Sequence, residues 1–335
     1  MNSRYNEIKV PVGYQFRICF VFLAAIFLYT SLSAQTSSDY DIRWIGQFPS
    51  TENDEKTSFK DRISELVFGR KPQEVIKPFN IVAANPDLYW ILDQGAGGIM
   101  KCHNGDGEAI KPMMKADHEF PSLVGMALLP GGEILCTDSR LNLVFLITEE
   151  KLSVFSELNS FNQPTGIAVS QERGEIWIVE TGAHQITVLN REGEVVKKIG
   201  GRGSGPGTFN YPTFIWIDGT GLVYIVDSMN FRVQILDQQG NFLFEFGDSG
   251  DATGNMARPK GVATDSKGNI YVADALFHVV QIFDREGDYL YSFGSQGQET
   301  GEFWMPAGIY IDEQDYIYVA DSYNARVQVF QLVEN

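Results

Sequence analysis

The sequence predicts an all-β fold: a six-bladed β-propeller of four-stranded antiparallel blades, closed by an N-terminal strand, with one short helix before the first blade. Two markers recur along the 335 residues at intervals of 42 to 48. One is a proline before an apolar run, at Pro78, Pro121, Pro164, Pro212, Pro259 and Pro306. The other is an acidic residue closing the next apolar run, at Asp93, Asp138, Glu180, Asp227, Asp274 and Asp321. Six repeats of this length are typical of propeller blades.

Each repeat contains four short apolar runs separated by polar turns. In one of the clearest, VYIVDSMNFRVQILDQQGNFLFEFG at residues 223–247 holds the last three runs. Apolar runs flanked by Gly, Asn and Asp predict strands joined by tight turns. Because the runs are apolar at nearly every position, both faces of each sheet are expected to be covered by neighbouring blades. A solenoid is the alternative, and ring closure favours the propeller.

The closure is predicted from the two ends of the chain. The last repeat has three of its four strands, whereas DIRWIGQ at residues 41–47 parallels the fourth strand of an earlier repeat, EVVKKIGGR at 194–202. We therefore expect Ile42–Gly46 to pair as the outer strand of the last blade.

A short helix is predicted between this strand and the first blade. TSFKDRISELVFG has apolar residues at helical spacing, a cap at Thr57 or Ser58 and a stop at Gly69. The helix is expected to pack over the junction of the first and last blades. Residues 35–77 would thus hold the closing strand and the helix, and residues 78–335 the propeller.

Residues 1–34 predict an export signal. Arg4, Lys9 and Arg17 precede the apolar stretch ICFVFLAAIFLYTSLSA at 18–34, which ends in small residues. This order is typical of a secretory signal peptide, here with cleavage near Ser33 or Ala34. An uncleaved membrane anchor is the alternative, although the run is short for a span. We expect an exported protein, located in the periplasm, at the cell surface or outside the cell.

The charge limits the possible partners. The formal net charge is −17, and removal of residues 1–34, whose net charge is +2, leaves −19. Such an acidic protein is repelled by phosphate backbones and anionic lipids. We expect no nucleic-acid partner, no membrane contact except through the signal segment, and a monomer.

Two cysteines, Cys102 and Cys136, lie beyond the signal segment in the apolar runs GGIMKC and EILCTD. A small buried thiol is the expectation for each. A disulfide between neighbouring blades is the alternative.

The repeats resemble the NHL repeat. The shared pattern is proline, Gly-Ile or Gly-Val, YVAD, Asn-x-Arg and VQVF, and it is clearest at 227–234 and 321–328. The resemblance extends from about Ile76 to the C-terminus. With its signal peptide, the whole arrangement resembles exported bacterial six-bladed propellers of NHL type, which implies the propeller fold.

A polar triplet recurs in the clearest repeats. It comprises Asp227, Asn230 and Arg232 in one repeat and Asp321, Asn324 and Arg326 in another. A carboxylate at a strand end can accept hydrogen bonds from turn amides and pair with an arginine that opens the next strand. We interpret these residues as a structural lock of the repeat.

The connections between blades supply candidate binding residues. Phe209, Tyr211, Phe303 and Trp304 lie in connections that span 12 residues from the last glycine of one blade to the next proline. Function often gathers on loops held by a rigid scaffold, so an aromatic-rimmed binding surface is one interpretation. The alternative is that these rings fill the gaps between blades.

His184 and His278 are further binding candidates, because each lies four residues after the acidic marker of its repeat. They could bind a ligand or a metal; the alternative is a structural role in the turn. In amidating lyases of NHL type, the zinc histidines directly follow the blade-opening proline. The residues at those positions are Phe79, Ser122, Thr165, Thr213, Lys260 and Ala307. We therefore expect no metal site, no cofactor and no catalytic residue.

These features favour a non-catalytic binding propeller that uses its loop face to hold another envelope or secreted protein, a peptide or a glycan. The alternative is a metal-dependent lyase or lactonase-type hydrolase. A calcium lactonase needs several oxygen ligands in the channel, and Asn80 is the one candidate near its mouth. The enzyme hypothesis therefore depends on the fold, which does not by itself imply a function.

Overall fold

The computed structural model describes residues 40–49, 75–103, 106–110, 120–148, 151–156 and 161–334. The expected signal segment and the expected helix at 57–69 lie outside these residues. The described residues between Ile42 and Val333 belong to the larger of two units.

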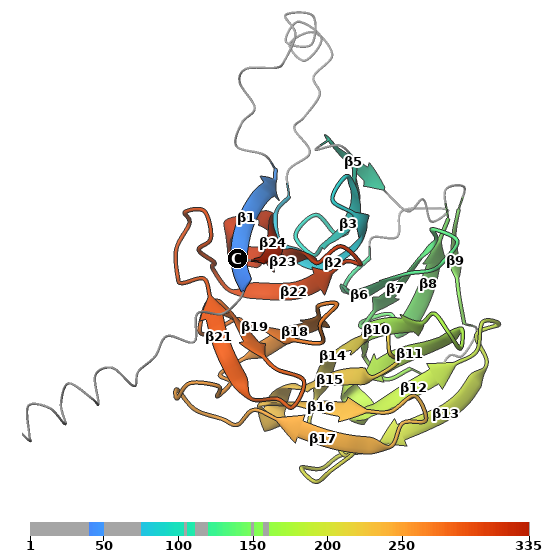
Figure 1. The fold of residues 1–335 in the computed structure, drawn as a ribbon. Helices are drawn as coiled ribbons and strands as arrows, with labels where there is room; N and C mark the ends of the chain where they lie inside the picture. Colours follow the sequence, from blue (N-terminus) through green and yellow to red (C-terminus); the bar gives the residue numbers. More distant parts are fainter. Residues whose placement is uncertain are drawn as a thin grey trace, which may run out of the picture. The chain divides into compact units, whose positions relative to one another are not determined.

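The larger unit contains six four-stranded antiparallel sheets around a central axis, which confirms the predicted six-bladed propeller (Figure 1). The inner strands of adjacent blades contact one another in a closed ring. From the inner to the outer strand, the first five sheets are β2 (Pro78–Asn85), β3 (Leu88–Asp93), β4 (Gly98–His103), β5 (Asp106–Ile110); β6 (Leu123–Leu128), β7 (Ile134–Asp138), β8 (Leu143–Ile147), β9 (Leu152–Val154); β10 (Pro164–Ser170), β11 (Glu175–Glu180), β12 (Gln185–Leu189), β13 (Val195–Gly200); β14 (Pro212–Ile217), β15 (Val223–Asp227), β16 (Arg232–Leu236), β17 (Phe242–Phe246); and β18 (Pro259–Thr264), β19 (Ile270–Asp274), β20 (Val279–Phe283), β21 (Tyr289–Phe293).

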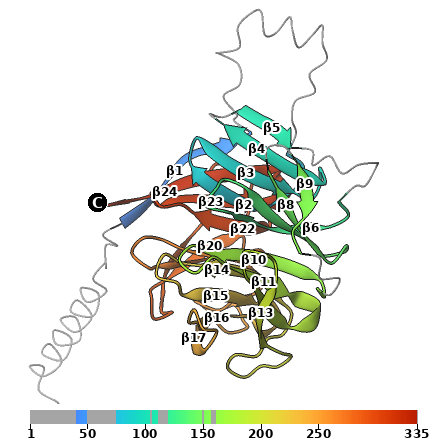
Figure 2. The same ribbon diagram turned by 90° about the vertical axis from the view of Figure 1, so that its right-hand side faces the viewer.

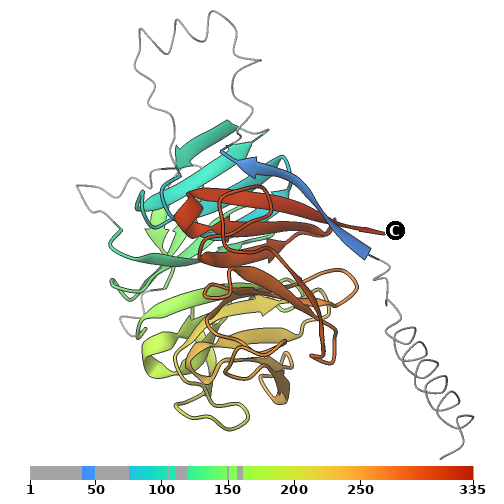
Figure 3. The same ribbon diagram turned by 90° about the vertical axis from the view of Figure 1, so that its left-hand side faces the viewer.

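The sixth sheet combines the two ends of the chain. Its order is β22 (Pro306–Ile311), β23 (Tyr316–Asp321), β24 (Arg326–Glu334) and β1 (Tyr40–Phe48), so the expected closing strand is confirmed (Figure 3). The guanidinium of Arg326 donates a hydrogen bond to Gln47 Oε1 at 3.2 Å. Phe48 is buried among residues of the first and last blades. The N-terminal strand therefore joins the ring where the last blade meets the first.

Packing between blades explains why the runs are apolar at nearly every position. Six apolar clusters fill the six interfaces between neighbouring sheets. Figure 2 shows the sheets of the first and last blades side by side. All five residues of β15 are buried: Val223 and Ile225 pack toward the preceding blade, and Tyr224 and Val226 toward the following one. A second strand is therefore covered on both faces, unlike a half-buried strand with alternating pattern.

Glycines near the start of the inner strands let the strands approach closely. A Cβ added to Gly166 would lie 2.9 Å from the backbone nitrogen of Ile215, and one added to Gly308 would lie 2.6 Å from the carbonyl oxygen of Phe79. No side chain fits at such distances. The channel is thus narrow at this level.

Cys102 and Cys136 are buried free thiols, so the disulfide between them does not form. Burial raises the pKa of each thiol to about 12, which keeps both protonated at neutral pH. No helix in the described part of the chain is long and apolar enough to cross a membrane.

Candidate functional site: the turn face and the central cavity

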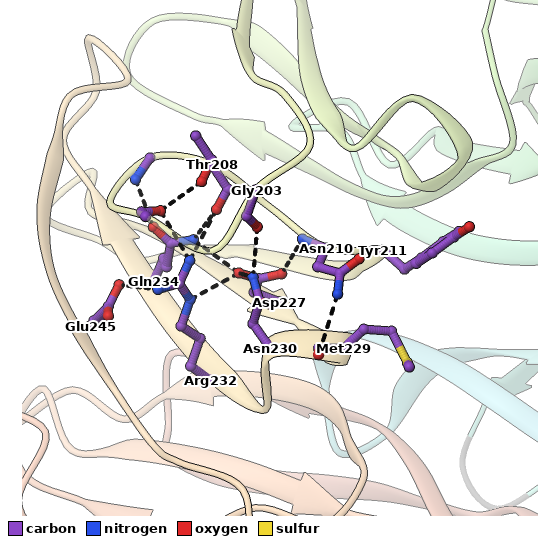
Figure 4. Close-up of polar contacts among 12 residues, drawn as sticks. Gly203, Thr208, Asn210, Tyr211, Asp227, Met229, Asn230, Arg232, Gln234 and Glu245 are labelled. Atoms are coloured by element: carbon purple, nitrogen blue, oxygen red, sulfur yellow. Dashed lines mark hydrogen bonds and ion pairs between the residues drawn. The ribbon is translucent and has the colours of Figure 1, made fainter.

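In five of the six blades, an aspartate that closes the second strand holds two loops together, whereas Glu180 joins the preceding connection to side chains of β12. Asp227 Oδ1 accepts a hydrogen bond from the backbone of Asn210, in the connection before the blade, at 2.6 Å. Its Oδ2 accepts hydrogen bonds from Asn230 at 2.8 Å and from Arg232 Nε at 2.9 Å (Figure 4). Asp227 is fully buried, so this network belongs to the interior.

Arg232 extends the network into the connection between blades. Arg232 Nη2 donates to the carbonyl oxygens of Gly205 and Thr208, both at 3.1 Å. Arg232 Nη1 pairs with Glu245 at 2.7 Å. Gln234 also donates to the carbonyl oxygen of Thr208 at 2.7 Å. The arginine therefore fixes the shape of the connection as well as the hairpin.

The last blade repeats these contacts. Asp321 accepts hydrogen bonds from the backbone of Trp304 at 2.7 Å, from Asn324 at 2.8 Å and from Arg326 Nε at 2.8 Å. Arg326 donates in turn to the carbonyl oxygens of Glu299 and Glu302. The six residues of the expected lock thus make two equivalent networks.

The other blades keep the carboxylate without the arginine pair. Asp93 accepts four backbone hydrogen bonds, two from the connection before its blade and two from its own turn. Asp138 and Asp274 join the same two loops. The turns after the second strands and the connections between blades therefore form one rigid surface, which we call the turn face.

Only two of the four candidate aromatic residues lie on the turn face. Tyr211 is 43% and Trp304 40% exposed, whereas Phe209 and Phe303 are both 0% exposed. Phe209 and Phe303 pack in the clusters between blades, each against the glycine that ends the preceding outer strand. Of the two interpretations, Phe209 and Phe303 fit the second: they fill the gaps between blades, which corrects their place among the candidate binding residues.

The two candidate histidines support the backbone of the next connection. His184 Nδ1 accepts a hydrogen bond from the backbone of Tyr211 at 3.0 Å, and His278 Nδ1 accepts one from the backbone of Met305 at 3.1 Å. Both histidines adopt positive φ, at 55° and 59°. The His184 ring also packs edge to face on Tyr211 at 4.4 Å. Each histidine thus helps to hold the connection to the next blade in place.

The turn face exposes more apolar side chains than the sequence led us to expect. Besides Tyr211 and Trp304, the exposed large apolar residues there are Ile76, Leu141, Met229, Leu276 and Tyr323. Met229, Leu276 and Tyr323 each lie two residues after the acidic marker of their blade. Figure 4 shows Tyr211 and Met229 extending away from the network around Asp227. Their recurrence at one repeat position was a detectable pattern.

Three basic residues lie next to blade-opening prolines, where inner strands start at the turn face. Lys77 and Arg258 directly precede blade-opening prolines, and Lys260 directly follows one. Burial, with the nearby charges of Arg258 and Lys77, lowers the pKa of Lys260 from 10.5 to about 8. Lys77 Nζ lies 5.6 Å from the centre of the Tyr323 ring. Within the described residues none of these three cations pairs with a carboxylate.

The channel widens toward the opposite end into a cavity of about 920 Å³. Its walls are the ends of the inner strands and the turns that follow them. Three of these turns share a device that sequence reasoning missed, in which an aspartate accepts a hydrogen bond from a tyrosine of the second strand. The pairs are Asp218 with Tyr224 at 3.0 Å, Asp265 with Tyr271 at 3.1 Å and Asp312 with Tyr318 at 2.8 Å.

Among the residues that the structure describes, no group of three His, Cys, Asp or Glu side chains is arranged to bind a metal ion. Asn80 lines the cavity, as expected from its place in the channel. It lies apart from the carboxylates of the turns, which are bonded to their own loops.

Sequence comparison identifies the repeat. Residues 303–330 match the NHL repeat, and residues 157–237 match a family described as 6-bladed beta-propeller. With the six sheets, these matches define the chain as a six-bladed β-propeller with NHL-type repeats. A comparison with curated proteins finds no relative.

Solved structures share this fold at low sequence identity. An auxiliary nutrient binding protein from Bacteroides ovatus aligns with a TM-score of 0.61 and 13% identity, over 88% of this chain and 77% of that one. A catalytically inactive virginiamycin B lyase from Staphylococcus aureus, with quinupristin, gives 0.56 and 14%, over 88% and 100%. A gluconolactonase from Xanthomonas campestris gives 0.59 and 11%, over 78% and 88%. The likeness shows the fold, which is shared by binding proteins and enzymes.

Proposed function

We propose that the protein is an exported, non-catalytic propeller that binds a partner polypeptide on its turn face. The observation that carries the proposal is the set of seven exposed large apolar side chains that the described residues place on this face, among them Trp304 at 40% and Tyr323 at 55%. Large exposed apolar patches mark interaction sites. Export is inferred from the sequence of residues 1–34.

The turn face is rigid enough for recognition. The ring centres of Trp304 and Tyr323 lie 5.9 Å apart. The backbone nitrogen of Tyr323 donates a hydrogen bond to the carbonyl oxygen of Trp304 at 3.1 Å. Asp321 holds the same connection from the interior. Side chains that are already ordered lose little conformational entropy on binding, which favours affinity.

The basic residues beside the blade-opening prolines indicate an acidic group in the partner. Lys77, Arg258 and Lys260 have no carboxylate partner among the described residues, although the chain as a whole carries a net charge of −17. Cations left unpaired in an acidic protein attract anions locally. An aspartate, glutamate or chain-terminal carboxylate of the partner would fit there.

A polypeptide fits this surface better than a glycan. Three of its seven apolar side chains are the aliphatic Ile76, Leu141 and Leu276, and a fourth is Met229. Aromatic and methionine side chains are enriched in protein interfaces. Aliphatic side chains scattered between the rings suit apolar residues of a partner and not the flat faces of sugars.

A metal-dependent lyase or lactonase-type hydrolase is the second candidate, since a virginiamycin B lyase and a gluconolactonase share the fold. Metal analysis of the purified protein separates the two candidates. Stoichiometric zinc or calcium would contradict the non-catalytic proposal.

The binding proposal is tested with a random dodecapeptide display library selected against the purified protein. We expect enrichment of peptides that combine Asp or Glu with aromatic or aliphatic residues. A synthetic copy should bind about tenfold more weakly to a Trp304→Ser/Tyr323→Ser variant. Leu290→Ser, on the outer strand β21, serves as the matched control. No enrichment, binding of a glycan array instead, or equal affinity for all three proteins would refute the proposal.

A further inference from the structure

The central cavity lies at the end of the channel away from the turn face and has its own chemistry. Each inner strand starts at the turn face and ends in a turn at the opposite end, because it pairs antiparallel with a second strand that closes at the turn face. The cavity of about 920 Å³ is lined by the inner strands from about their third residue onward, where Asn80 and Phe214 lie, and by those turns. This volume suits a small organic molecule.

Aromatic rings form part of the wall. The Trp216 and Tyr310 rings meet edge to face, with centres 5.3 Å apart and an interplanar angle of 82°. Trp216 Nε1 donates to Thr264 Oγ1 at 2.9 Å, which fixes the indole. Phe214 and Trp90 add further aromatic surface. The wall therefore contains aromatic rings, and the Trp216 indole is held in place by its hydrogen bond and ring contact.

Two polar groups in the wall lack partners among the described residues. Asn80 is 4% exposed, and its amide nitrogen makes one long hydrogen bond, 3.4 Å, to the carbonyl oxygen of Val124. Its Oδ1 receives no hydrogen bond from the described residues, nor does the Tyr310 hydroxyl make one there. Asn80 Oδ1 is accessible from the cavity, so it can accept a hydrogen bond from a donor group of a ligand there.

The charged residues of the wall are all acidic. Glu172, Asp218, Asp265, Asp312 and Glu313 line the cavity, and no lysine, arginine or histidine of the described residues lines it. The three aspartates accept hydrogen bonds from their own turns. Glu313 is exposed and has no bonded partner in the described part of the chain. A low-dielectric cavity edged by carboxylates concentrates a negative potential.

We propose that this cavity binds a small organic cation with an apolar body, such as a substituted ammonium compound. The aromatic rings attract the cationic group through their negative faces, the carboxylates supply the long-range field, and Asn80 Oδ1 accepts a hydrogen bond from the cation or its polar substituent. The aliphatic parts of the inner strands enclose the apolar body. The proposal is independent of the polypeptide site, which lies at the other end of the channel.

The probe is benzyltrimethylammonium, titrated calorimetrically into the purified protein. Its neutral isostere, 2,2-dimethylpropylbenzene, has the same shape without the charge. We expect saturable one-to-one binding of the cation and about tenfold weaker binding of the neutral compound. Absence of saturable binding, or equal affinity for both compounds, would overturn the proposal.

Variants locate the site. Glu313→Gln removes one exposed charge and is expected to weaken cation binding a fewfold without affecting folding, and Trp216→Leu should weaken it about tenfold. Met229→Ser, on the turn face, is the control and should leave the affinity unchanged. An affinity that falls with Met229→Ser but not with Glu313→Gln would overturn the assignment to the cavity. Peptide binding at the turn face should be unaffected by Glu313→Gln, so the two proposals fail separately.

Discussion

Arg232 Nε lies 2.9 Å from Oδ2 of Asp227, and the aspartate side chain is fully buried. The pair joins β15 to β16, and the same arginine holds the connection that ends at Tyr211. The interior of a blade and the side chains displayed on the turn face are therefore coupled through one ion pair.

Asp227→Asn is expected to lower the free energy of unfolding by about 3–5 kcal/mol, because it removes the buried counter-charge of the Arg232 guanidinium and leaves the partly exposed Glu245 as its remaining carboxylate partner. Urea unfolding followed by circular dichroism measures the change. Asp251→Asn, in an exposed part of a connection, is the control and should change it by less than about 0.5 kcal/mol. A loss below about 1 kcal/mol in Asp227→Asn would show that the pair does not stabilise the blade.

Tyr318→Phe and Tyr310→Phe form a matched pair in the last blade. The Tyr318 hydroxyl donates to Asp312 at 2.8 Å, whereas the Tyr310 hydroxyl bonds no described residue. Loss of the first hydroxyl should cost about 1–2 kcal/mol of unfolding free energy, and loss of the second close to none. Equal effects in thermal unfolding would argue against a role for the aspartate–tyrosine bond.

Phe303→Ala and Trp304→Ala separate packing from recognition. Phe303 is 0% exposed, so its truncation should lower stability by about 3–5 kcal/mol. Trp304 is 40% exposed, and its truncation should weaken peptide binding while changing stability much less. Both properties are measured on the same two proteins. If Phe303→Ala left stability intact, the role of this ring as a filler between blades would be wrong.

The lowered pKa of Lys260 predicts that the free energy of unfolding depends on pH. Its folded-state pKa is lowered from 10.5 to about 8, so between these values the unfolded chain holds more protons and the free energy of unfolding rises with pH. Lys260→Met should remove this rise and increase stability at pH 7 by about 2 kcal/mol, an amount reduced for partial exposure. Urea titrations at pH 7, 8, 9 and 10 test this. Parallel pH profiles for the two proteins would contradict the burial of a charged amine.

Two aromatic residues of the closing strand are expected to contribute differently to the free energy of unfolding. Phe48 is 5% exposed between the first and last blades, and Phe48→Ala should lower the unfolding free energy by about 3–5 kcal/mol. Trp44, on the same strand, is 36% exposed, and Trp44→Ala should cost much less. Deletion of residues 35–46 should lower the melting temperature by many degrees. An unchanged melt after deletion would refute closure by this strand.

The fold could be predicted because each blade needs the same residue types at the same backbone positions, and these residues recur at similar intervals in the sequence. Pro164, Pro212, Pro259 and Pro306 all begin inner strands in the structure. The closing strand was predictable for the same reason, since residues 41–47 repeat the pattern of an outer strand. Residues that have the same backbone role in every blade therefore recur periodically in the sequence.

The surface was harder to predict because exposure depends on packing between blades. Phe303 and Trp304 are neighbours in sequence, yet one is buried and the other is on the turn face. The cavity was missed because its wall is assembled from inner strands of different blades, and Trp216 and Tyr310 are 94 residues apart. Both residues hold the same repeat position, four residues after a blade-opening proline, but the repeat pattern alone does not indicate that these positions line a cavity.

The most direct test of binding on the turn face is hydrogen exchange with and without a selected peptide. Protection is predicted in the turns at 228–231, 275–278 and 322–325 and in the connections before Pro212 and Pro306. These segments carry the exposed side chains and the loops fixed by Asp227 and Asp321. Protection confined instead to the turns at 218–221, 265–268 and 312–315, at the cavity end, would contradict the proposed binding face.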